Sequence, residues 1–247
     1  MRRAIPLALA LALALAPGAA AAPRPIVRPA NGTGPPLRLG AELYAGNCAV
    51  CHGIDGRGTR IGPSLRGVGA LAPDFYLSTG YMPLGNPHEQ PLRVQVQLSR
   101  RERDALVRYI ASLGKGPPIP SPDPASGDVA EGRELFTEHC AGCHQVVAEG
   151  GIMPGAKAPP LNRSTPVQIA EAVRIGPYVM PTFSPRDITD AQLNSIIAYV
   201  QYAKDPHDAG GWGIDHLGPF PEGMVTWFAA IVVLIATCMA LGKRMSK

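Results

Sequence analysis

The sequence contains few aromatic residues, no clustered basic patch and no strand–helix–strand pattern. Phe, Trp and Tyr make up 6% of the 247 residues, so two small domains would each have a thin apolar core and would need a cofactor, a metal or a staple. The formal net charge is only +4, and without a basic patch we expect no nucleic-acid partner. Pro and Gly are abundant, at 27 and 28 copies, which indicates loops and linkers.

Cysteine is also scarce, and its pattern is informative. Five cysteines are present, an odd number that argues against a fold held only by disulfides. Four of them fall in two Cys-x-x-Cys-His motifs: Cys48, Cys51 and His52, and Cys140, Cys143 and His144. The fifth, Cys238, lies alone in an apolar stretch, and we interpret it as a small apolar side chain rather than a ligand.

The two motifs belong to an internal repeat with a constant offset of 92 residues. The segment Gly40–His52 matches Gly132–His144 position by position in its glycine, Glu-Leu-aromatic and Cys-x-x-Cys-His residues. Each copy continues through a Pro-containing turn to a Met-Pro pair, which begins at Met82 in the first copy and at Met180 in the second. Self-similarity of this kind predicts two domains of one fold in tandem.

A helix is predicted to close each copy. Capping-box patterns mark the starts at Ser99 to Glu102 and at Thr189 to Gln192. Apolar residues then recur at helical spacing and are expected in the core: Leu106, Val107, Ile110 and Leu113 in the first copy, and Leu193, Ile196, Ile197 and Val200 in the second. Five prolines between Gly114 and Gly127 exclude a helix there and predict a semi-rigid linker.

The motif itself is the attachment signature of c-type haem. Two thiols on one helical turn can each form a thioether with a haem vinyl group, and the adjacent imidazole then reaches the iron from the same side. A thioredoxin-like motif would require a βαβ pattern, which is missing, and a zinc site would require four converging ligands. Two motifs in matching frames therefore predict two covalently bound haem c groups.

The second iron ligand is predicted from the repeat. Met82 and Met180 precede Pro at the same place in the two copies, 30 and 36 residues after the motif histidines. His/Met ligation raises the haem potential and closes the iron to other ligands. Met153 also precedes a proline but has no counterpart in the first copy, so we set it aside. His88 is the fallback ligand if Met82 is not one.

The two ends of the chain carry export and membrane signals. Residues 1–22 have a basic start, a short Ala/Leu core and a small-residue exit, typical of a cleaved signal peptide; an uncleaved anchor is the alternative. Met224 to Leu241 is eighteen residues without a charge, and at about 1.5 Å per residue it spans about 27 Å. Lys243, Arg244 and Lys247 follow it, which predicts a cytoplasmic C-terminus.

Each half resembles a class I cytochrome c domain, through its Cys-x-x-Cys-His motif and downstream Met-Pro pair. The segment from Gly210 to Gly223, which leads directly into the apolar stretch, is similar to the tail of the dihaem cytochrome c subunit (cytochrome cc) of actinobacterial cytochrome bcc complexes. That resemblance implies a subunit of a quinol–cytochrome c reductase in the plasma membrane with extracytoplasmic haems. It also implies cytochrome b and a Rieske iron–sulfur protein as partners, and electron transfer to an aa3-type oxidase.

The expected fold is all-α, with two tandem class I cytochrome c domains and a C-terminal transmembrane helix. The expected segments are 1–22 signal peptide or anchor, 23–39 linker, 40–114 first domain, 115–127 linker, 128–205 second domain, 206–222 pre-membrane segment, 223–242 transmembrane helix and 243–247 cytoplasmic tail. The alternatives are a tethered dihaem cytochrome of a dehydrogenase or another oxidase, and a dihaem peroxidase. Two Met-ligated irons argue against a peroxidase, which needs an open iron site, and we expect no catalytic residues in this chain.

Overall fold

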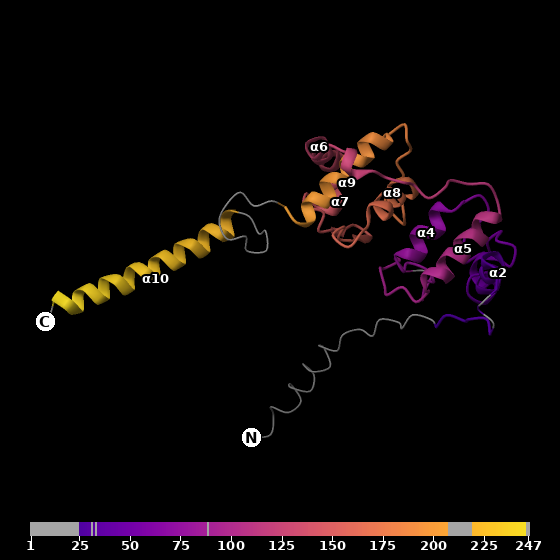
Figure 1. Cartoon of the computed structure of the whole chain (residues 1–247), viewed down its shortest axis with the longest axis horizontal. Helices are drawn as coiled ribbons and strands as arrows, with labels where there is room; N and C mark the ends of the chain where they lie inside the picture. The colour runs from indigo at the N-terminus through magenta and orange to yellow at the C-terminus, as the bar shows by residue number, and fades with distance from the viewer. Residues whose placement is uncertain (1–24, 31, 33, 88, 207–218, 246–247) are drawn as a thin grey trace, which may run out of the picture. The chain divides into compact units, whose positions relative to one another are not determined.

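The computed structural model describes residues 25–206 and 219–245, apart from residues 31, 33 and 88. The predicted signal peptide, the fallback ligand His88 and most of the pre-membrane segment lie outside the described residues. Helices dominate the rest of the chain (Figure 1).

The helices follow one another in the order that the repeat predicts, with additional short elements between them. The elements of the first copy are α2 (Pro36–Asn47), α3 (Ala49–His52), α4 (Leu71–Ser78) and α5 (Arg100–Ser112). Those of the second copy are η1 (Pro124–Ser126), α6 (Val129–His139), α7 (Ala141–His144), β1 (Gly151–Met153), β2 (Ala156–Ala158), α8 (Pro166–Ile175) and α9 (Asp190–Lys204), and α10 (Pro219–Met245) follows.

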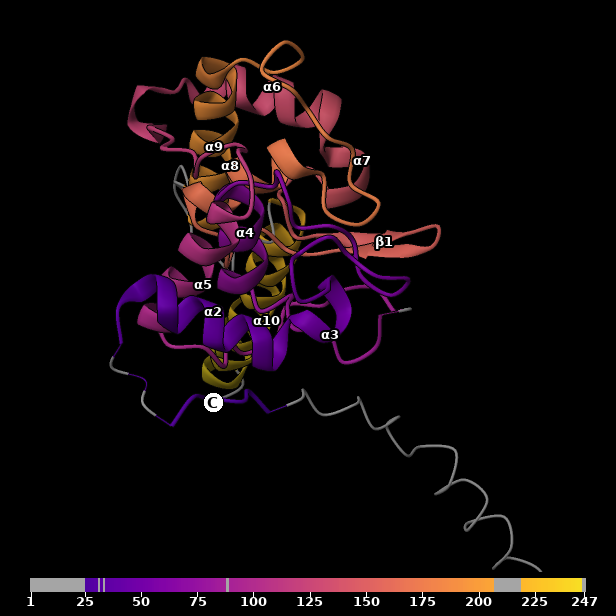
Figure 2. The ribbon, with the colours of Figure 1, turned by 90° about the vertical axis from the view of Figure 1, so that its right-hand side faces the viewer.

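The packed chain falls into two units. The first contains α2 to α5 together with most of the β1–β2 hairpin and α8, and the second contains α6, α7, nearly all of α9, and α10. The hairpin is the only sheet in the part of the chain that the structure describes, and Figure 2 labels its first strand, β1. It lies in the second copy, in a stretch that is longer than its counterpart in the first.

In the first copy, α2 and α5 cross at a glycine. A Cβ atom at Gly40 would lie 2.7 Å from the Cβ of Tyr109 and would overlap the carbonyl oxygen of Ala105. Around this crossing, Tyr44 packs on Tyr109 with ring centroids 5.2 Å apart. The core cluster consists of Leu39, Leu43, Tyr44, Leu77, Leu98, Ala105, Leu106, Val107 and Ile110. Figures 1 and 2 both show α2 beside α5.

The second copy repeats this crossing between α6 and α9. A Cβ atom at Gly132 would lie 3.0 Å from the Cβ of Tyr199 and would overlap the carbonyl oxygen of Ser195. Phe136 packs on Tyr199 with ring centroids 5.4 Å apart. The Ser195 hydroxyl also donates to the Glu131 carboxylate at 2.6 Å, which binds the two helices through a side-chain hydrogen bond. The paired glycines therefore allow the same close helix contact in both copies.

The starts of the closing helices agree with the sequence pattern. Ser99 and Glu102 form a reciprocal capping box at the start of α5, and α9 begins at Asp190, directly after the predicted cap Thr189. The predicted core residues of both helices are buried except Leu113, which lies half-buried at the end of α5. The first helix begins at Pro36, ahead of the predicted domain start at Gly40.

Helices α4 and α8 are not anticipated by the sequence analysis. Thr165 and Gln168 form a capping box at the start of α8, with Pro166 in its first turn. The helix ends at Gly176, whose φ of 63° is the left-handed conformation that glycine adopts without strain. Within the first unit, α4 packs against both α5 and α8.

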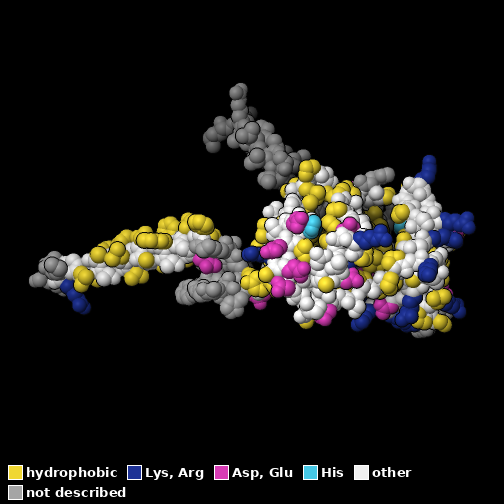
Figure 3. Space-filling view, turned by 90° about the horizontal axis from the view of Figure 1, so that it is seen from above, with side chains coloured by type: hydrophobic (Ala, Val, Ile, Leu, Met, Phe, Trp, Pro, Cys, Tyr) yellow, Lys and Arg dark blue, Asp and Glu magenta, His cyan; other side chains and the backbone are white. Residues whose placement is uncertain are grey.

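Helix α10 is mostly apolar and is exposed along most of its length. Its stretch Phe220–Arg244 has a mean hydropathy of 2.4 and none of it is buried. Figure 3 shows hydrophobic side chains along the helix and Lys and Arg side chains at its far end. The helix is long and apolar enough to cross a membrane.

Candidate functional site

The first motif is built on a sharp break between two helices. Helix α2 ends at Asn47, and Cys48 caps it before the single turn of α3. The amides of Cys51 and His52 both donate to the Cys48 carbonyl, at 3.1 and 2.9 Å. The turn therefore holds both thiols and the imidazole on one short helical segment. The two cysteines are half-buried and carry free thiols, as thioether formation requires.

The ring of His52 is oriented by the loop that follows it. Its Nδ1 atom lies 2.8 Å from the carbonyl oxygen of Pro63, and because a carbonyl only accepts, Nδ1 carries the proton. The Nε2 atom is then left with a lone pair, which is the arrangement of metal-ligating histidines. A Cβ atom at Gly62 would meet the backbone of Cys51, so glycine is needed for the loop to pass this close to the motif.

Met82 is brought to the same apolar cluster as Cys48. Both residues are half-buried and pack against the core cluster around Leu39 and Leu43. The Met82 amide donates to the Tyr76 carbonyl at 3.1 Å, which ties the Met-Pro segment to the end of α4. These positions fit the predicted ligand role of Met82, and the iron ligation itself stays a prediction.

The second motif reproduces the geometry of the first. The amides of Cys143 and His144 donate to the Cys140 carbonyl at 3.1 and 2.9 Å, the same two distances as in the first copy. Both thiols are free and half-buried, whereas the His144 side chain is almost completely buried, at 8% exposure.

The loop after each motif is closed by matching backbone hydrogen bonds. In the second copy, Gly150 donates to His144 at 2.9 Å and Leu161 to Ala148 at 2.8 Å. In the first copy, the corresponding bonds run from Gly58 to His52 and from Leu65 to Gly56, both at 2.8 Å. The loop that the Leu161–Ala148 bond closes is longer than the loop that the Leu65–Gly56 bond closes, because it contains the β1–β2 hairpin. The repeat thus extends from the sequence to individual hydrogen bonds.

Met180 lies just beyond the left-handed end of α8. It is half-buried, and its amide donates to the Pro177 carbonyl at 3.1 Å. A Cβ atom at Gly176 would crowd both the Met180 carbonyl and the Thr182 backbone, so the chain can turn back here only with glycine. Met153, set aside in the sequence analysis, lies on β1. The ligand role of Met180 stays a prediction.

The leading thiol of each motif is strongly disfavoured as a thiolate. Burial, and then the neighbouring Cys51, raises the pKa of Cys48 to about 12. Burial, and then Cys143, raises the pKa of Cys140 to about 11. Redox-active Cys-x-x-Cys motifs have lowered pKa values instead, and the described residues contain no group of three or more His, Cys, Asp or Glu that could hold a metal. The raised pKa values weigh against the thioredoxin-like alternative.

One tyrosine hydroxyl in each copy fixes the backbone after the motif, a feature that the sequence analysis missed. Tyr44 on α2 donates to the Gly53 carbonyl at 2.8 Å. The matching position in the second copy is Phe136, which has no hydroxyl, and Tyr199 on α9 instead donates to the Val146 carbonyl at 2.6 Å. The sequence does contain a signal for this difference, because Tyr44 of the first copy is replaced by Phe136 at the matching position of the second.

Comparison with known families agrees with this geometry. A family model described as "Cytochrome c" matches residues 37–114, and one described as "Cytochrome C oxidase, cbb3-type, subunit III" matches residues 127–200. Two such domains, each with a Cys-x-x-Cys-His turn, define a c-type cytochrome with an all-α fold, as predicted. Cytochrome c domains imply covalently bound haem c, and the free thiols and oriented His52 ring fit that group.

Relatives place the chain more narrowly. The cytochrome bc1 complex cytochrome c subunit of Corynebacterium diphtheriae is 35% identical over 229 residues, covering 84% of this chain and 81% of the relative. The subunit of the same name from Mycobacterium tuberculosis is 35% identical over 218 residues, covering 84% and 78%. The chain belongs to this family of bc1-complex cytochrome c subunits. The cbb3-type cytochrome c oxidase subunit CcoP of Azospirillum brasilense is more distant, at 29% identity over 70% of this chain and 61% of the relative.

Proposed function

We propose that this chain is the dihaem electron carrier of a quinol-oxidising cytochrome bc complex, in which it relays electrons from a Rieske iron–sulfur protein to a terminal oxidase. The observation that carries the proposal is the double occurrence of one haem-binding turn, with the same hydrogen-bond pattern in both copies. Membership of the bc1-complex cytochrome c subunit family supports the quinol-oxidising complex, with cytochrome b and the Rieske protein as partners.

In this proposal each copy holds one haem c, with thioethers to its two motif cysteines. The iron ligands are His52 and Met82 in the first copy, and His144 and Met180 in the second. When bound, the haem supplies an iron that gains and loses one electron. The protein keeps the ring of the ligating histidine in one tautomer and orientation, as the His52–Pro63 bond illustrates, and a methionine sulfur closes the iron to other ligands.

A membrane anchor would hold both haem domains close to the other components of the relay. We propose that α10 crosses the plasma membrane with its C-terminus in the cytoplasm, because Lys243 and Arg244 follow the apolar stretch. Both haem domains then lie on the extracytoplasmic side. A shared anchor and a short linker raise the effective concentration of each haem near membrane-bound donors and acceptors, so an aa3-type oxidase can be reduced without a separate soluble cytochrome.

A second candidate keeps the electron-carrier role and changes the complex. The second copy matches the family model of a cbb3-type oxidase subunit, and CcoP is a more distant relative. A tethered dihaem subunit within an oxidase would need the same haem turns and the same anchor. The two candidates differ in their partners: cytochrome b and a Rieske protein for the first, and oxidase subunits alone for the second.

The first experiment is a pull-down of the tagged chain from membranes in mild detergent, analysed by mass spectrometry and by pyridine haemochrome spectra. We expect two haems c per chain, with cytochrome b, a Rieske protein and aa3-type oxidase subunits in the eluate. Oxidase subunits without cytochrome b would support the second candidate and overturn the first.

Haem content per copy is tested by replacing both cysteines of one motif. The variant with Cys140→Ala and Cys143→Ala should keep one haem c and lose quinol-dependent oxidase activity, whereas a single Cys238→Ala variant should keep both haems. Full electron transfer to the oxidase by the one-haem variant would refute the relay.

A further inference from the structure

Segments of the two copies meet in a polar seam between α4 and α8. Both helices lie in the first unit and pack against each other, although α4 belongs to the first copy and α8 to the second. The Gln168 side chain donates to the Ser78 hydroxyl at 3.0 Å and accepts from Arg93 at 3.0 Å. We refer to these contacts, with the helices that carry them, as the α4–α8 seam.

The seam extends to the hairpin of the second copy. The Gln90 side chain donates to the Lys157 carbonyl at 2.7 Å and accepts from the Lys157 amide at 2.8 Å. This reciprocal pair places the primary amide of Gln90 against the backbone of β2, as a neighbouring strand would be placed. Arg93 also donates to the Ser164 hydroxyl, at 3.3 Å. The contact between the copies is therefore fixed at several points along the chain.

A carboxylic acid is completely buried in this seam. Glu171 lies on α8 with an exposure of 0%, and neither of its carboxyl oxygens accepts or donates a hydrogen bond that meets normal geometry. A buried carboxylate without a partner is strongly unfavourable, so such a group binds a proton instead. The residue belongs to neither motif and the proposed relay does not use it.

The neighbouring charge on α4 is a second carboxyl group, that of Asp74. Burial first, and then the charge of Asp74, raises the pKa of Glu171 to about 9. Two carboxylates cannot donate to each other, but a protonated carboxyl group can donate to an ionised one. Beside the charge of Asp74, the buried Glu171 is therefore favoured in its protonated form.

The titratable groups around Glu171 come from α4, α8, the segment before α5, and α5, which also packs on α4. They are Asp74 and Tyr76 on α4, Arg174 on α8, Arg93 before α5, and Arg100, Arg101, Glu102, Arg103, Asp104, Arg108 and Tyr109 on α5. Arg93 binds Ser164 and Gln168, and Arg174 binds the carbonyls of Phe183 and Ile188 and the carboxylate of Asp190. Burial raises the pKa of Tyr76, so it is neutral. Within the described residues, neither Glu171 nor Asp74 takes part in an ion pair.

We propose that the buried carboxyl group of Glu171 is a proton-binding site, and that its bound proton holds α8 of the second copy on α4 of the first. The ligand is a single proton, which Glu171 binds at neutral pH. Its loss leaves a buried Glu171 carboxylate beside the half-buried carboxyl group of Asp74, and the uncompensated charge draws water into the seam. The contact between the copies thus becomes weaker in alkaline solution.

Linkage gives the sign of the effect on stability. The folded pKa of Glu171 is raised above its ordinary value, so the folded state binds a proton that the unfolded state has released. Stability from this site is fully present below the ordinary glutamate pKa and is lost as the pH rises toward about 9. Between these limits the folding equilibrium shifts by about tenfold per pH unit for one such proton.

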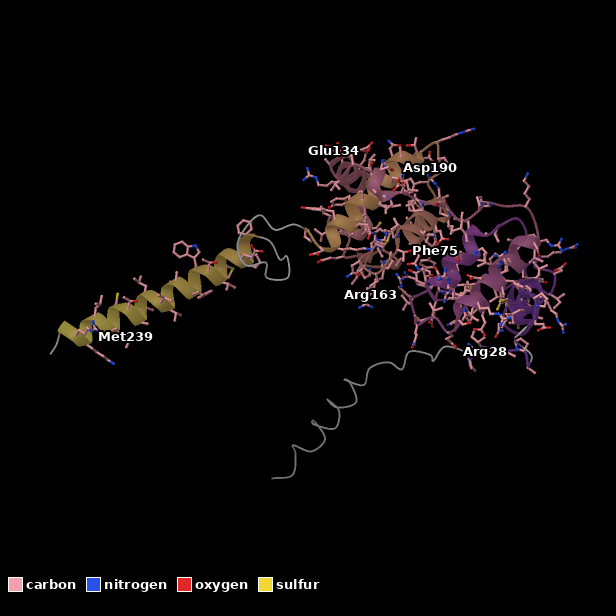
Figure 4. The ribbon with its side chains drawn as sticks, in the orientation of Figure 1. Arg28, Phe75, Glu134, Arg163, Asp190 and Met239 are labelled. Carbon is pink, nitrogen blue, oxygen red and sulfur yellow. The ribbon has the colours of Figure 1, made fainter. Side chains whose placement is uncertain are left out.

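Infrared spectroscopy of the full-length, haem-loaded chain in detergent tests the bound proton directly. We expect a carbonyl band of a protonated, buried carboxyl group at neutral pH, its loss in Glu171→Gln, and its retention in Glu134→Gln. Glu134 is exposed on the outer side of α6 (Figure 4) and serves as the matched control. A neutral-pH spectrum without that band, or a band unchanged in Glu171→Gln, would overturn the proposal.

Thermal melting as a function of pH provides the second test. Because glutamine resembles the protonated acid, Glu171→Gln should melt at a higher temperature than wild type at pH 8, and the difference should shrink toward acidic pH. Asp74→Asn, which removes the second carboxyl group, should shift in the same direction. A uniform decrease in melting temperature for Glu171→Gln at every pH would show that Glu171 is an ordinary ionised hydrogen-bond acceptor and would refute the proton site.

Discussion

The crossing of α2 and α5 allows a sharp test of the fold, the variant Gly40→Ala. The added Cβ would overlap the Ala105 carbonyl oxygen and approach the Tyr109 Cβ to 2.7 Å. Neither atom can be moved by a rotamer change, because the Ala105 oxygen belongs to the backbone of α5 and the Tyr109 Cβ is bonded directly to that backbone. The helices must therefore move apart, which opens the core cluster at its centre.

The expected magnitude has two parts of opposite sign. Overpacking of a core usually costs about 1–3 kcal/mol, and forced backbone movement puts this site at the upper end or above. Alanine in place of glycine within a helix returns about 0.5–1 kcal/mol. We therefore expect Gly40→Ala to lower the free energy of unfolding by about 2–3 kcal/mol.

Gly46 on the same helix is the matched control. Its added Cβ would meet only Val27, at an ordinary contact distance of 3.4 Å, so Gly46→Ala should stabilise the chain by about 0.5–1 kcal/mol. Guanidinium unfolding of the full-length protein gives both values, and hydrogen exchange of α5 assigns the effect to the first copy. A Gly40→Ala chain as stable as wild type would show that the two helices do not cross as closely as described.

The remaining predictions concern the iron ligands and the tyrosine that stabilises the second motif. Met82→Ala and Met180→Ala should each open one iron to carbon monoxide and lower the potential of that haem, as measured by optical spectra and redox titration, whereas Met153→Ala should do neither. Native potentials and no carbon monoxide binding in either of the first two variants would show that its ligand is assigned wrongly. Tyr199→Phe leaves a backbone carbonyl without its donor and should cost about 1–3 kcal/mol in unfolding experiments; a neutral result would mean that water replaces the hydroxyl.

The parts of the fold that the sequence predicts well are those repeated in it. The closing helices, their shared start after a Ser or Thr cap and their buried faces follow from local patterns that need no knowledge of the rest of the chain. The motif turns do so as well, since Cys-x-x-Cys-His is short enough to be read as one helical turn. Gly40 and Gly132 occupy matched positions in the repeat, although only the structure explains why both must be glycine.

What the sequence does not reveal depends on contacts between distant segments. Helix α8 has a readable capping box at Thr165, but it is short, and its partner α4 lies nearly ninety residues earlier, as the separation of Gln168 and Ser78 shows. The reciprocal bond between Gln90 and Lys157 likewise joins segments 67 residues apart. No periodicity marks such pairs in a single sequence, so the α4–α8 seam could not be predicted.

The second copy shows how one physical requirement is met by different residues. The carbonyl that follows the motif turn needs a buried donor, because an unpaired backbone group there would be costly. Tyr44 supplies that donor from the opening helix of the first copy, whereas Phe136 cannot, and Tyr199 supplies it from the closing helix of the second. In both copies a tyrosine hydroxyl thus binds a carbonyl directly after the motif, although the two carbonyls, Gly53 and Val146, are one residue out of register. A comparison of hydrogen bonds therefore detects a correspondence that a comparison of side chains at matched positions would miss.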